Sequence, residues 1–178
     1  VPVVRRRSGG GAVVLGPGCL VYSLLLDARK NPELRSVRGS YRWILGRLSE
    51  QFRAEGLPVS RAGLSDLALN GRKVGGCAQQ RRRGFLMHHG TLLYDMDLDL
   101  MEELIRHPSQ APPYRDDRGH VDFNANLPAD RAELEDIVSR AFNRTAGPPI
   151  TLENGDIWAR IERLKEQRYC NPDWNFRR

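Results

Sequence analysis

One lysine of the chain stands where its amine could polarise an oxygen of a bound ligand. Lys73 follows the turn signal Asn70-Gly71 and precedes four small residues at positions 75–78. Small side chains leave room for a ligand against a strand, and a lysine ammonium is a compact donor suited to one oxygen. It can also neutralise charge that develops in a transition state. The alternative is an ordinary solvated lysine in a hairpin, and this segment alone leaves both interpretations open.

A second segment, residues 5–11, reads Arg-Arg-Arg-Ser-Gly-Gly-Gly. Three consecutive glycines allow a ligand to approach the backbone and aim several N–H groups at one anion. Arginines add planar donors for phosphate or carboxylate. The segment is neither a Walker loop, which needs a following Gly-Lys-Ser/Thr, nor a dinucleotide-binding fingerprint, which needs a following helix. It predicts an anion-binding loop, with a flexible hairpin carrying solvated charges as the alternative.

A third segment, residues 85–95, carries His88 and His89 before Gly90 in an apolar strand. Adjacent residues of a strand point to opposite faces, so the two histidines are not expected to bind one metal together. One of them could line a pocket; the alternative is one core histidine and one exposed histidine. The three cysteines show neither a disulfide rhythm nor zinc-ligand spacing. We therefore expect no metal site.

These segments need strands and turns to position them, and the hydrophobic pattern supplies them. Strands are predicted at residues 1–4, 12–15, 19–26, 64–69, 72–80 and 85–94, and helices at 40–55, 98–107, 129–142 and 151–169. Residues 115–126 are predicted to form a polar loop and residues 171–178 a tail. Strands dominate the first half and helices the second. This order predicts an α+β fold with a mixed, mostly antiparallel sheet flanked by helices.

The composition limits the function classes. A chain of 178 residues can bury the core of one domain, and it has no apolar run long enough for a membrane helix. The first residues do not resemble a signal peptide, so we expect a cytoplasmic protein. The 28 basic residues comprise 25 arginines and three lysines, which suits anionic partners. Aromatic residues do not alternate with the basic clusters, so nucleic acid is not an expected partner.

In this order, the three segments resemble the lipoate–protein ligase family, also called the biotin/lipoate A/B protein ligase family. The family's Arg-Arg-x-Ser-Gly-Gly-Gly-Ala-Val loop matches residues 5–13. Its Asp-Leu…Gly-x-Lys-x-x-Gly-x-Ala strand pair matches residues 66–78, and its His-His-Gly-Thr-Leu-Leu strand matches residues 88–93. An acidic helix start at 95–104 and a Tyr-x-x-x-x-Trp-Asn segment at 169–175 extend the similarity nearly end to end.

The resemblance implies a fold like the catalytic domain of biotin protein ligases, with Lys73 as the catalytic residue at the acyl carboxylate and the adenylate phosphate. The residues that it implies for the acyl-adenylate are Arg6, Ser8, Gly9, Gly10, Gly11, Ala12, Val13 and Val14. Those implied for the acyl substrate are Asp66, Gly76, Ala78, His89, Gly90 and Thr91.

The resemblance also implies a reaction in two steps. ATP, with Mg²⁺, activates lipoate or octanoate as acyl-AMP, and the acyl group then passes to a lysine of a lipoyl domain. The implied acceptors are the lipoyl domains of 2-oxoacid dehydrogenase acyltransferase subunits or the glycine cleavage H protein. A basic surface would suit the acidic face of such acceptors.

The chain departs from the family pattern at several places. A His-Asp pair that usually follows the triglycine strand is replaced by Leu15-Gly16. The family's N-terminal strand–helix–strand portion and the small C-terminal accessory domain of some ligases have no counterpart. We therefore expect residues 1–178 to form one catalytic domain without these parts, and a separate accessory protein is a further candidate partner.

Two alternatives to an ATP-dependent ligase stay open. Octanoyl and lipoyl transferases of the family move the acyl group from a carrier protein through a cysteine thioester. That cysteine lies upstream of the lysine segment, where this chain has residues 57–60, Leu-Pro-Val-Ser. Cys77 occupies a position in the glycine strand where a small packed side chain is expected. The second alternative is an inactive, arginine-rich binding module.

Overall fold

The computed structural model describes residues 1–142 and 155–177. The chain divides into two compact units, Gly9–Thr145 and a smaller one made of Val1–Ser8 with Ala146–Arg178.

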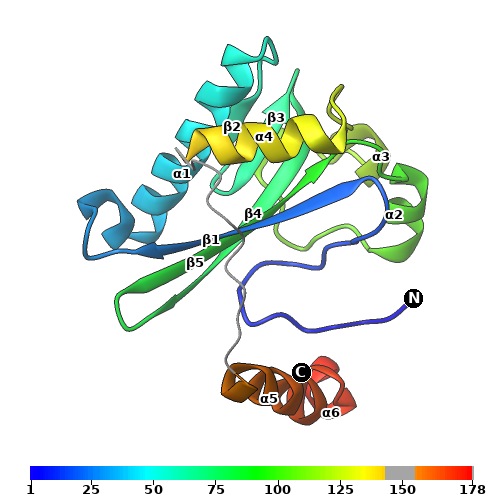
Figure 1. The fold of residues 1–178 in the computed structure, drawn as a ribbon. Helices are drawn as coiled ribbons and strands as arrows, with labels where there is room; N and C mark the ends of the chain where they lie inside the picture. Colours follow the sequence, from blue (N-terminus) through cyan, green and yellow to red (C-terminus); the bar gives the residue numbers. More distant parts are fainter. Residues whose placement is uncertain (143–154, 178) are drawn as a thin grey trace. The chain divides into compact units, whose positions relative to one another are not determined.

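The larger unit is built on a five-stranded sheet (Figure 1). Its strands are β1 (Cys19–Asp27), β2 (Ser60–Ala62), β3 (Asp66–Leu69), β4 (Arg72–Arg82) and β5 (Phe85–Leu93). They lie in the order β1-β5-β4-β3-β2, and each neighbouring pair is antiparallel. This arrangement confirms the predicted α+β class and the antiparallel sheet.

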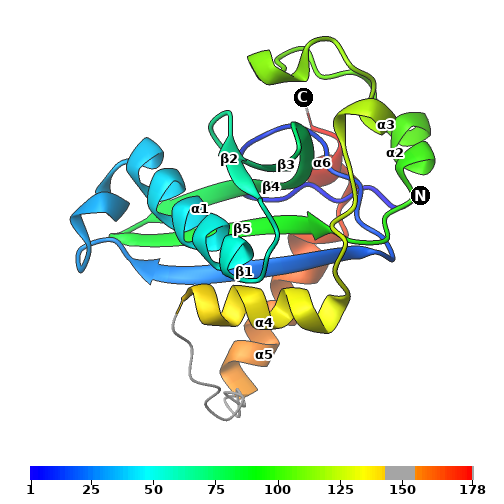
Figure 2. The same ribbon diagram turned by 90° about the horizontal axis from the view of Figure 1, so that it is seen from above.

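Two helices, α1 (Val37–Ala54) and α4 (Arg131–Ala141), pack on one face of this sheet, which we call the covered face (Figure 2). Helix α1 begins at Ser36, whose Oγ accepts the N–H of Gly39. Helix α4 begins with a capping box between Asp130 and Glu133. Apolar residues at helical spacing put one side of each helix against the strands. The main core lies between these helices and the sheet.

The remaining elements of the larger unit are short: η1 (Pro32–Arg35), α2 (Leu98–Leu104), η2 (Pro113–Arg115) and α3 (His120–Phe123). The smaller unit contains α5 (Gly155–Leu164), the π-helical turn η3 (Lys165–Tyr169) and α6 (Pro172–Asn175). Within it, the Arg5 N–H donates to Asn175 Oδ1 at 2.9 Å, and Trp174 Nε1 donates to the Arg5 carbonyl at 2.8 Å. These bonds tie the first residues to the last helix.

The structure corrects several predicted elements. Residues 1–4 and 12–15 are not strands, because a strand needs a hydrogen-bonded neighbour and these segments pair with none of the described strands. The helix predicted at 98–107 ends at Leu104, since Ile105 adopts an extended conformation. The predicted loop at 115–126 contains α3, and the predicted tail contains α6. Residues 151–154 of the last predicted helix lie outside the described residues.

Strand β2 was not predicted, because three residues carry too little periodicity to mark a strand. Among the described residues, no helix combines the length and apolar character needed to cross a membrane.

Candidate functional site

The β3–β4 hairpin carries the predicted lysine and aspartate. Its turn residues Asn70 and Gly71 have φ values of 50° and 75°, as the tight turn predicted from this dipeptide requires. The pairing shifts next to the turn: Ala68 faces Lys73, whereas Leu67 faces Gly75. Val74 is therefore an extra residue on β4, that is, a β-bulge. A bulge changes which residues share a face of the sheet.

The bulge directs Lys73 to the same face as Gly76, on the side of the sheet opposite the covered face. The Lys73 Nζ lies 2.8 Å from Asp66 Oδ1, and the two side chains are 28% and 9% exposed. A Cβ on Gly76 would stand 2.9 Å from both Cε and Nζ of Lys73. The missing side chain of Gly76 thus makes the space that the lysine amine occupies.

Several predicted substrate residues share this face. Gly76 pairs with Thr91, and Ala78 pairs with His89, so these four residues stand in two adjacent rows across β4 and β5. Gly76, His89 and Thr91 are half-buried and Ala78 is buried. Together with the Lys73–Asp66 pair they form a surface with small side chains and one ammonium, which we call the lysine face.

Gly90, in contrast, lies on the covered face. It pairs with Tyr22 of β1 and with Cys77 of β4. A Cβ on Gly90 would stand 2.7 Å from the Tyr22 hydroxyl oxygen and 2.8 Å from Cys77 Sγ. Glycine here lets the Tyr22 hydroxyl reach Cys77 Sγ, 3.3 Å away. Burial raises the pKa of Cys77 to about 12, so the thiol is protonated at neutral pH.

His88 is the core histidine of the pair. It is fully buried, its Nε2 lies 3.4 Å from the Tyr22 hydroxyl, and its Nδ1 lies 3.4 Å from Gln79 Nε2. Burial, with a smaller contribution from His89, lowers the pKa of His88 to about 4. His88 is therefore neutral at pH 7. It belongs to the packing behind the lysine face, while His89 lies on that face.

The segment between α2 and α4 supplies contacts that the sequence did not predict. The Tyr114 hydroxyl donates to Asp66 Oδ2 at 2.9 Å. The Ala125 N–H donates to the Lys73 carbonyl at 2.8 Å, and Asn124 forms an isolated parallel bridge with Lys73. No periodicity or motif marks these residues in the sequence. Their role follows only from the path of the chain across the hairpin.

The triglycine segment belongs to both units: Arg6 and Ser8 to the smaller one, and residues 9–14 to the larger one. Gly9 to Val13 are exposed, and Gly10 has a φ of 93°, which favours glycine. Val14 packs on a small cluster formed by Leu93, Met96 and Met101. The exposed backbone agrees with a loop that could receive a ligand, and the contacts expected of it stay predictions.

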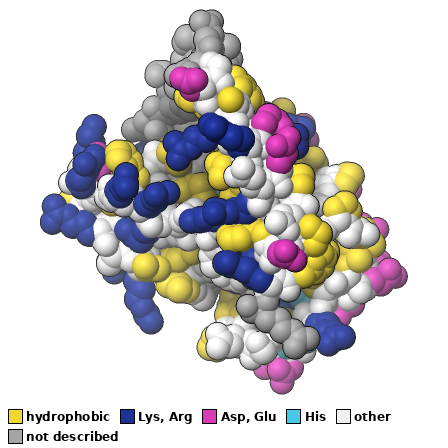
Figure 3. All heavy atoms as spheres, turned by 90° about the horizontal axis from the view of Figure 1, so that it is seen from below, with side chains coloured by type: hydrophobic (Ala, Val, Ile, Leu, Met, Phe, Trp, Pro, Cys, Tyr) yellow, Lys and Arg dark blue, Asp and Glu magenta, His cyan; other side chains and the backbone are white. Residues whose placement is uncertain are grey.

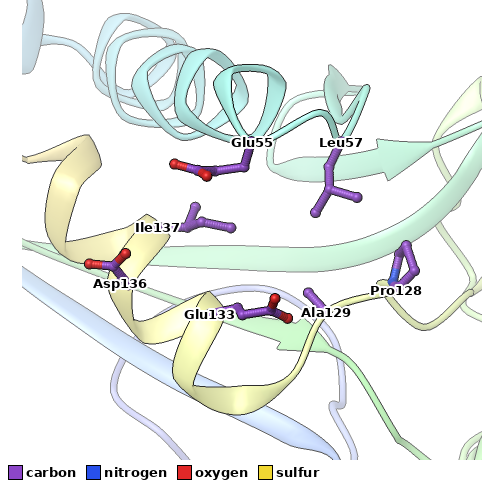
Figure 4. Close-up of a pocket in the computed structure, with 7 residues that line it drawn as sticks. All are labelled: Glu55, Leu57, Pro128, Ala129, Glu133, Asp136 and Ile137. Carbon is purple, nitrogen blue, oxygen red and sulfur yellow. The ribbon is translucent and has the colours of Figure 1, made fainter.

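A pocket of about 170 Å³ lies elsewhere, between the end of α1 and the start of α4 (Figure 4). It is lined by Glu55, Leu57, Pro128, Ala129, Glu133, Asp136 and Ile137, and so by none of the predicted site residues. Arg140 forms ion pairs with Glu55 at 3.1 Å and with Asp136 at 2.6 Å. These carboxylates are neutralised surface groups, and the pocket offers no chemistry comparable to the lysine face.

Arginine supplies most of the positive charge of the chain. Lys and Arg side chains are abundant on the surface seen in Figure 3. Separately, the burial of each residue shows that Arg38, Arg42, Arg82 and Arg83 are exposed. Over the described part of the chain, no three His, Cys, Asp or Glu residues are grouped so as to hold a metal ion.

Comparisons with known proteins bear on this site. A family model described as the lipoyl protein ligase A/B catalytic domain matches residues 1–143. The chain is 27% identical over 205 residues to octanoyltransferase LipM of Brevibacillus brevis, covering 97% of this chain and 74% of that protein. It is 25% identical over 190 residues to lipoate-protein ligase LplJ of Bacillus subtilis, covering 99% of this chain and 54% of that protein.

Among solved structures, the fold is similar to that of a bipartite lipoate protein ligase from Thermoplasma acidophilum, which was studied with its E2 lipoyl domain. The TM-score is 0.77 at 21% identity, over 97% of this chain and 69% of that one. At this identity the likeness concerns the fold.

Proposed function

Because the chain belongs to the lipoyl protein ligase A/B catalytic domain family, we propose that it transfers an octanoyl or lipoyl group to a lysine of a lipoyl domain. The match confirms the family resemblance found in the sequence motifs. LipM and LplJ, both similar to this chain, are respectively an octanoyltransferase and a lipoate ligase. Attachment of such acyl groups is the chemistry that their names share.

The observation that carries the proposal is the Lys73–Asp66 pair beside Gly76. Asp66 holds the ammonium at 2.8 Å, on a face where small residues leave room for an acyl chain. An ammonium fixed in this way stabilises the negative charge that develops on the carbonyl oxygen during attack. Because Asp66 holds the amine of Lys73 in place, little reorganisation of this side chain is needed for the reaction.

For the acyl donor, we favour an octanoyl group on a carrier protein, because LipM-type octanoyltransferases are prominent among the relatives. In a direct transfer, the neutral amine of the acceptor lysine attacks the carbonyl carbon of the carrier thioester. The amide bond forms as the carbon–sulfur bond breaks, and the amine proton passes to the departing thiolate. Lys73 stays protonated and holds the carbonyl oxygen throughout.

A second candidate is the ATP-dependent ligase, with Mg²⁺·ATP and free lipoate or octanoate as substrates. One observation favours it. The transferase cysteine expected near residues 57–60 is absent, and Cys77 has a pKa raised to about 12 on the covered face. A protonated thiol is a poor nucleophile. In this reaction the exposed residues 9–13 would bind the adenylate phosphate.

The proposed acceptors are the lipoyl domains of 2-oxoacid dehydrogenase acyltransferase subunits and the glycine cleavage H protein. A separate accessory protein is a further proposed partner, and the bipartite organisation of the Thermoplasma ligase supports it. The net charge of +6 would favour encounter with an acidic acceptor.

One assay separates the two reactions. A lipoyl-domain acceptor is incubated with the protein and either octanoyl-carrier protein without ATP, or free octanoate with ATP and Mg²⁺, and the acceptor mass is followed. Modification from the carrier protein without ATP is the expected result. Modification only in the ATP reaction would replace the transferase by the ligase. Absence of modification in both reactions, with and without added accessory subunit, would refute acyl transfer altogether.

A further inference from the structure

Tyr114 contacts the residue that orients Lys73. Its hydroxyl donates to Asp66 Oδ2 at 2.9 Å, while Lys73 donates to Oδ1 of the same carboxylate at 2.8 Å. Asp66 is only 6% exposed, so its oxygens depend on protein donors. A buried carboxylate that loses one donor is left with an unsatisfied oxygen. The two donors therefore fix the plane of the carboxylate between them.

The chemistry of Tyr114 limits it to a donor. Partial burial, followed by the charge of Asp66 and the hydrogen bond to it, raises the pKa of Tyr114 well above its usual range. The phenol is thus protonated at any pH at which the enzyme would work. It cannot serve as a base, and its hydroxyl hydrogen has the carboxylate as its acceptor.

The segment that carries Tyr114 is anchored by arginines to the hairpin turn. Arg118 Nη2 donates to the carbonyls of Gly71 at 3.1 Å and Tyr114 at 2.7 Å. Arg118 Nε donates to the Arg115 carbonyl at 2.9 Å, and Arg115 Nε donates to the Arg118 carbonyl at 2.8 Å. The Tyr114 ring packs on Phe123, with centroids 5.0 Å apart. Backbone carbonyls bound in this way hold the segment in one place relative to Lys73.

We propose that Tyr114 is a positioning residue for acyl transfer, acting through Asp66 on the Lys73 ammonium. This inference rests on the proposed function of the lysine face. Without the phenol, the buried carboxylate turns to recover a second donor, because an unsatisfied oxygen costs more than the rotation. Lys73 then spends less time at the place where it meets the carbonyl oxygen.

Tyr114→Phe tests this role, with Tyr94→Phe as the matched control at a tyrosine outside the pair. Loss of one hydrogen bond to a charged group predicts a fall of about tenfold in kcat/KM for acyl transfer. We expect this fall in kcat, with KM for the acyl donor changed less than about twofold, since the effect concerns the transition state. Tyr94→Phe should leave both constants within about twofold.

A second readout does not depend on acyl transfer. The chain has three lysines, Lys30, Lys73 and Lys165, and N-hydroxysuccinimidyl acetate acylates lysine amines that it can reach. Peptide mass spectrometry therefore gives the rate of Lys73 acetylation relative to Lys30 within one sample. The contact with Asp66 shields the Lys73 amine from the reagent, so Tyr114→Phe, which loosens that contact, should raise this ratio about threefold or more. Tyr94→Phe should leave it unchanged.

The outcomes separate the two proposals. An acetylation ratio that is unchanged or lower in Tyr114→Phe overturns the role of Tyr114, whatever the acyl donor. Failure of acyl transfer with every donor, alongside a raised ratio, rejects the proposed function but keeps the Tyr114–Asp66–Lys73 coupling. If Tyr114→Phe does not fold, Arg118→Gln takes its place, because it loosens the same segment. An unchanged ratio in that variant also overturns the inference.

Discussion

The β3–β4 hairpin and the triglycine segment were both predicted to contact the acyl-adenylate, yet they differ in construction. Lys73 is held by Asp66 through its side chain and by Ala125 through its carbonyl. Residues 9–13 are exposed, and added Cβ atoms at Gly9 and Gly11 would meet nothing within 4 Å. One region is held by side-chain and backbone contacts that the structure shows; the other is exposed, with room around its glycines.

The difference teaches how a site can divide its tasks. A charge that stabilises a transition state must be held in place, because motion during the reaction costs catalysis. A loop that binds a ligand through its backbone must let the ligand come close to that backbone. Glycine allows this approach but makes the loop less rigid. The hairpin thus suits the chemical step, and the loop suits binding. Three predictions test this division, from the largest expected effect to the smallest.

Lys73→Ala should lower acyl transfer by about 100-fold or more, the loss typical of removing one preorganised oxyanion donor. The fold should remain, since this lysine contributes little to the core, but the midpoint of thermal unfolding should fall because buried Asp66 loses one of its donors. Steady-state kinetics and thermal unfolding monitored by circular dichroism measure the two effects.

Lys30→Ala, at an exposed lysine, is the control and should keep full activity. Activity of Lys73→Ala within about threefold of the parent protein, a barrier change under about 0.7 kcal/mol, would exclude the assigned role.

Because His88 is buried behind the hairpin, the free energy of unfolding of the larger unit should fall in mild acid. The His88 pKa is lowered from 6.5 to about 4. Between these two pH values, the unfolded state therefore binds a proton at His88 and the folded state does not. This contribution to stability is complete above pH 6.5 and is lost as pH falls toward 4. The loss amounts to about 3 kcal/mol over that window. Urea unfolding at a series of pH values measures it.

In His88→Gln, the free energy of unfolding should depend less on pH, whatever the stability of the variant at pH 7. His107→Gln, at an exposed position, should show the same pH dependence as the parent protein. A free energy of unfolding that stays constant from pH 7 to pH 5 in the parent protein would contradict the assignment.

Gly76→Ala and Gly11→Ala compare the two regions directly. The new Cβ at Gly76 meets the end of the Lys73 side chain, which can move away without disturbing the backbone. We expect nearly unchanged stability and about tenfold lower kcat. At Gly11 the Cβ meets open space, so stability and kcat should hold, while KM for the donor rises severalfold if the loop binds it. Equal kcat values in the two variants would show that the hairpin and the triglycine segment are not divided between the chemical step and ligand binding.

Much of the fold could be predicted from sequence because local signals were strong. The strands around Asn70-Gly71, the α1 helix and the order of elements follow from turn chemistry and hydrophobic periodicity. Residues 1–4 and 12–15 were mistaken for strands since valine-rich composition indicates β structure only where a neighbour is available. The family assignment also came from the sequence, through three motifs in one order, and was confirmed.

The candidate site was only partly predictable. Lys73, Asp66, Gly76 and Thr91 were named from motifs, but the contact of Tyr114 with Asp66 joins residues 48 positions apart and leaves no local trace. Gly90 was grouped with the substrate residues, and the pairing places it on the covered face beside Tyr22 and Cys77. Facing direction depends on register, which periodicity alone does not fix.

The sequence by itself determined that a lysine follows a tight turn and precedes small residues in a strand. It could not determine which way that lysine points. In an unbroken strand, Lys73 and Gly76 would face opposite sides, because they are three residues apart. The bulge at Val74, seen only in the pairing of β3 with β4, brings both to one side with Asp66. Tertiary structure thus decided that the lysine, the carboxylate and the space beside them form one site.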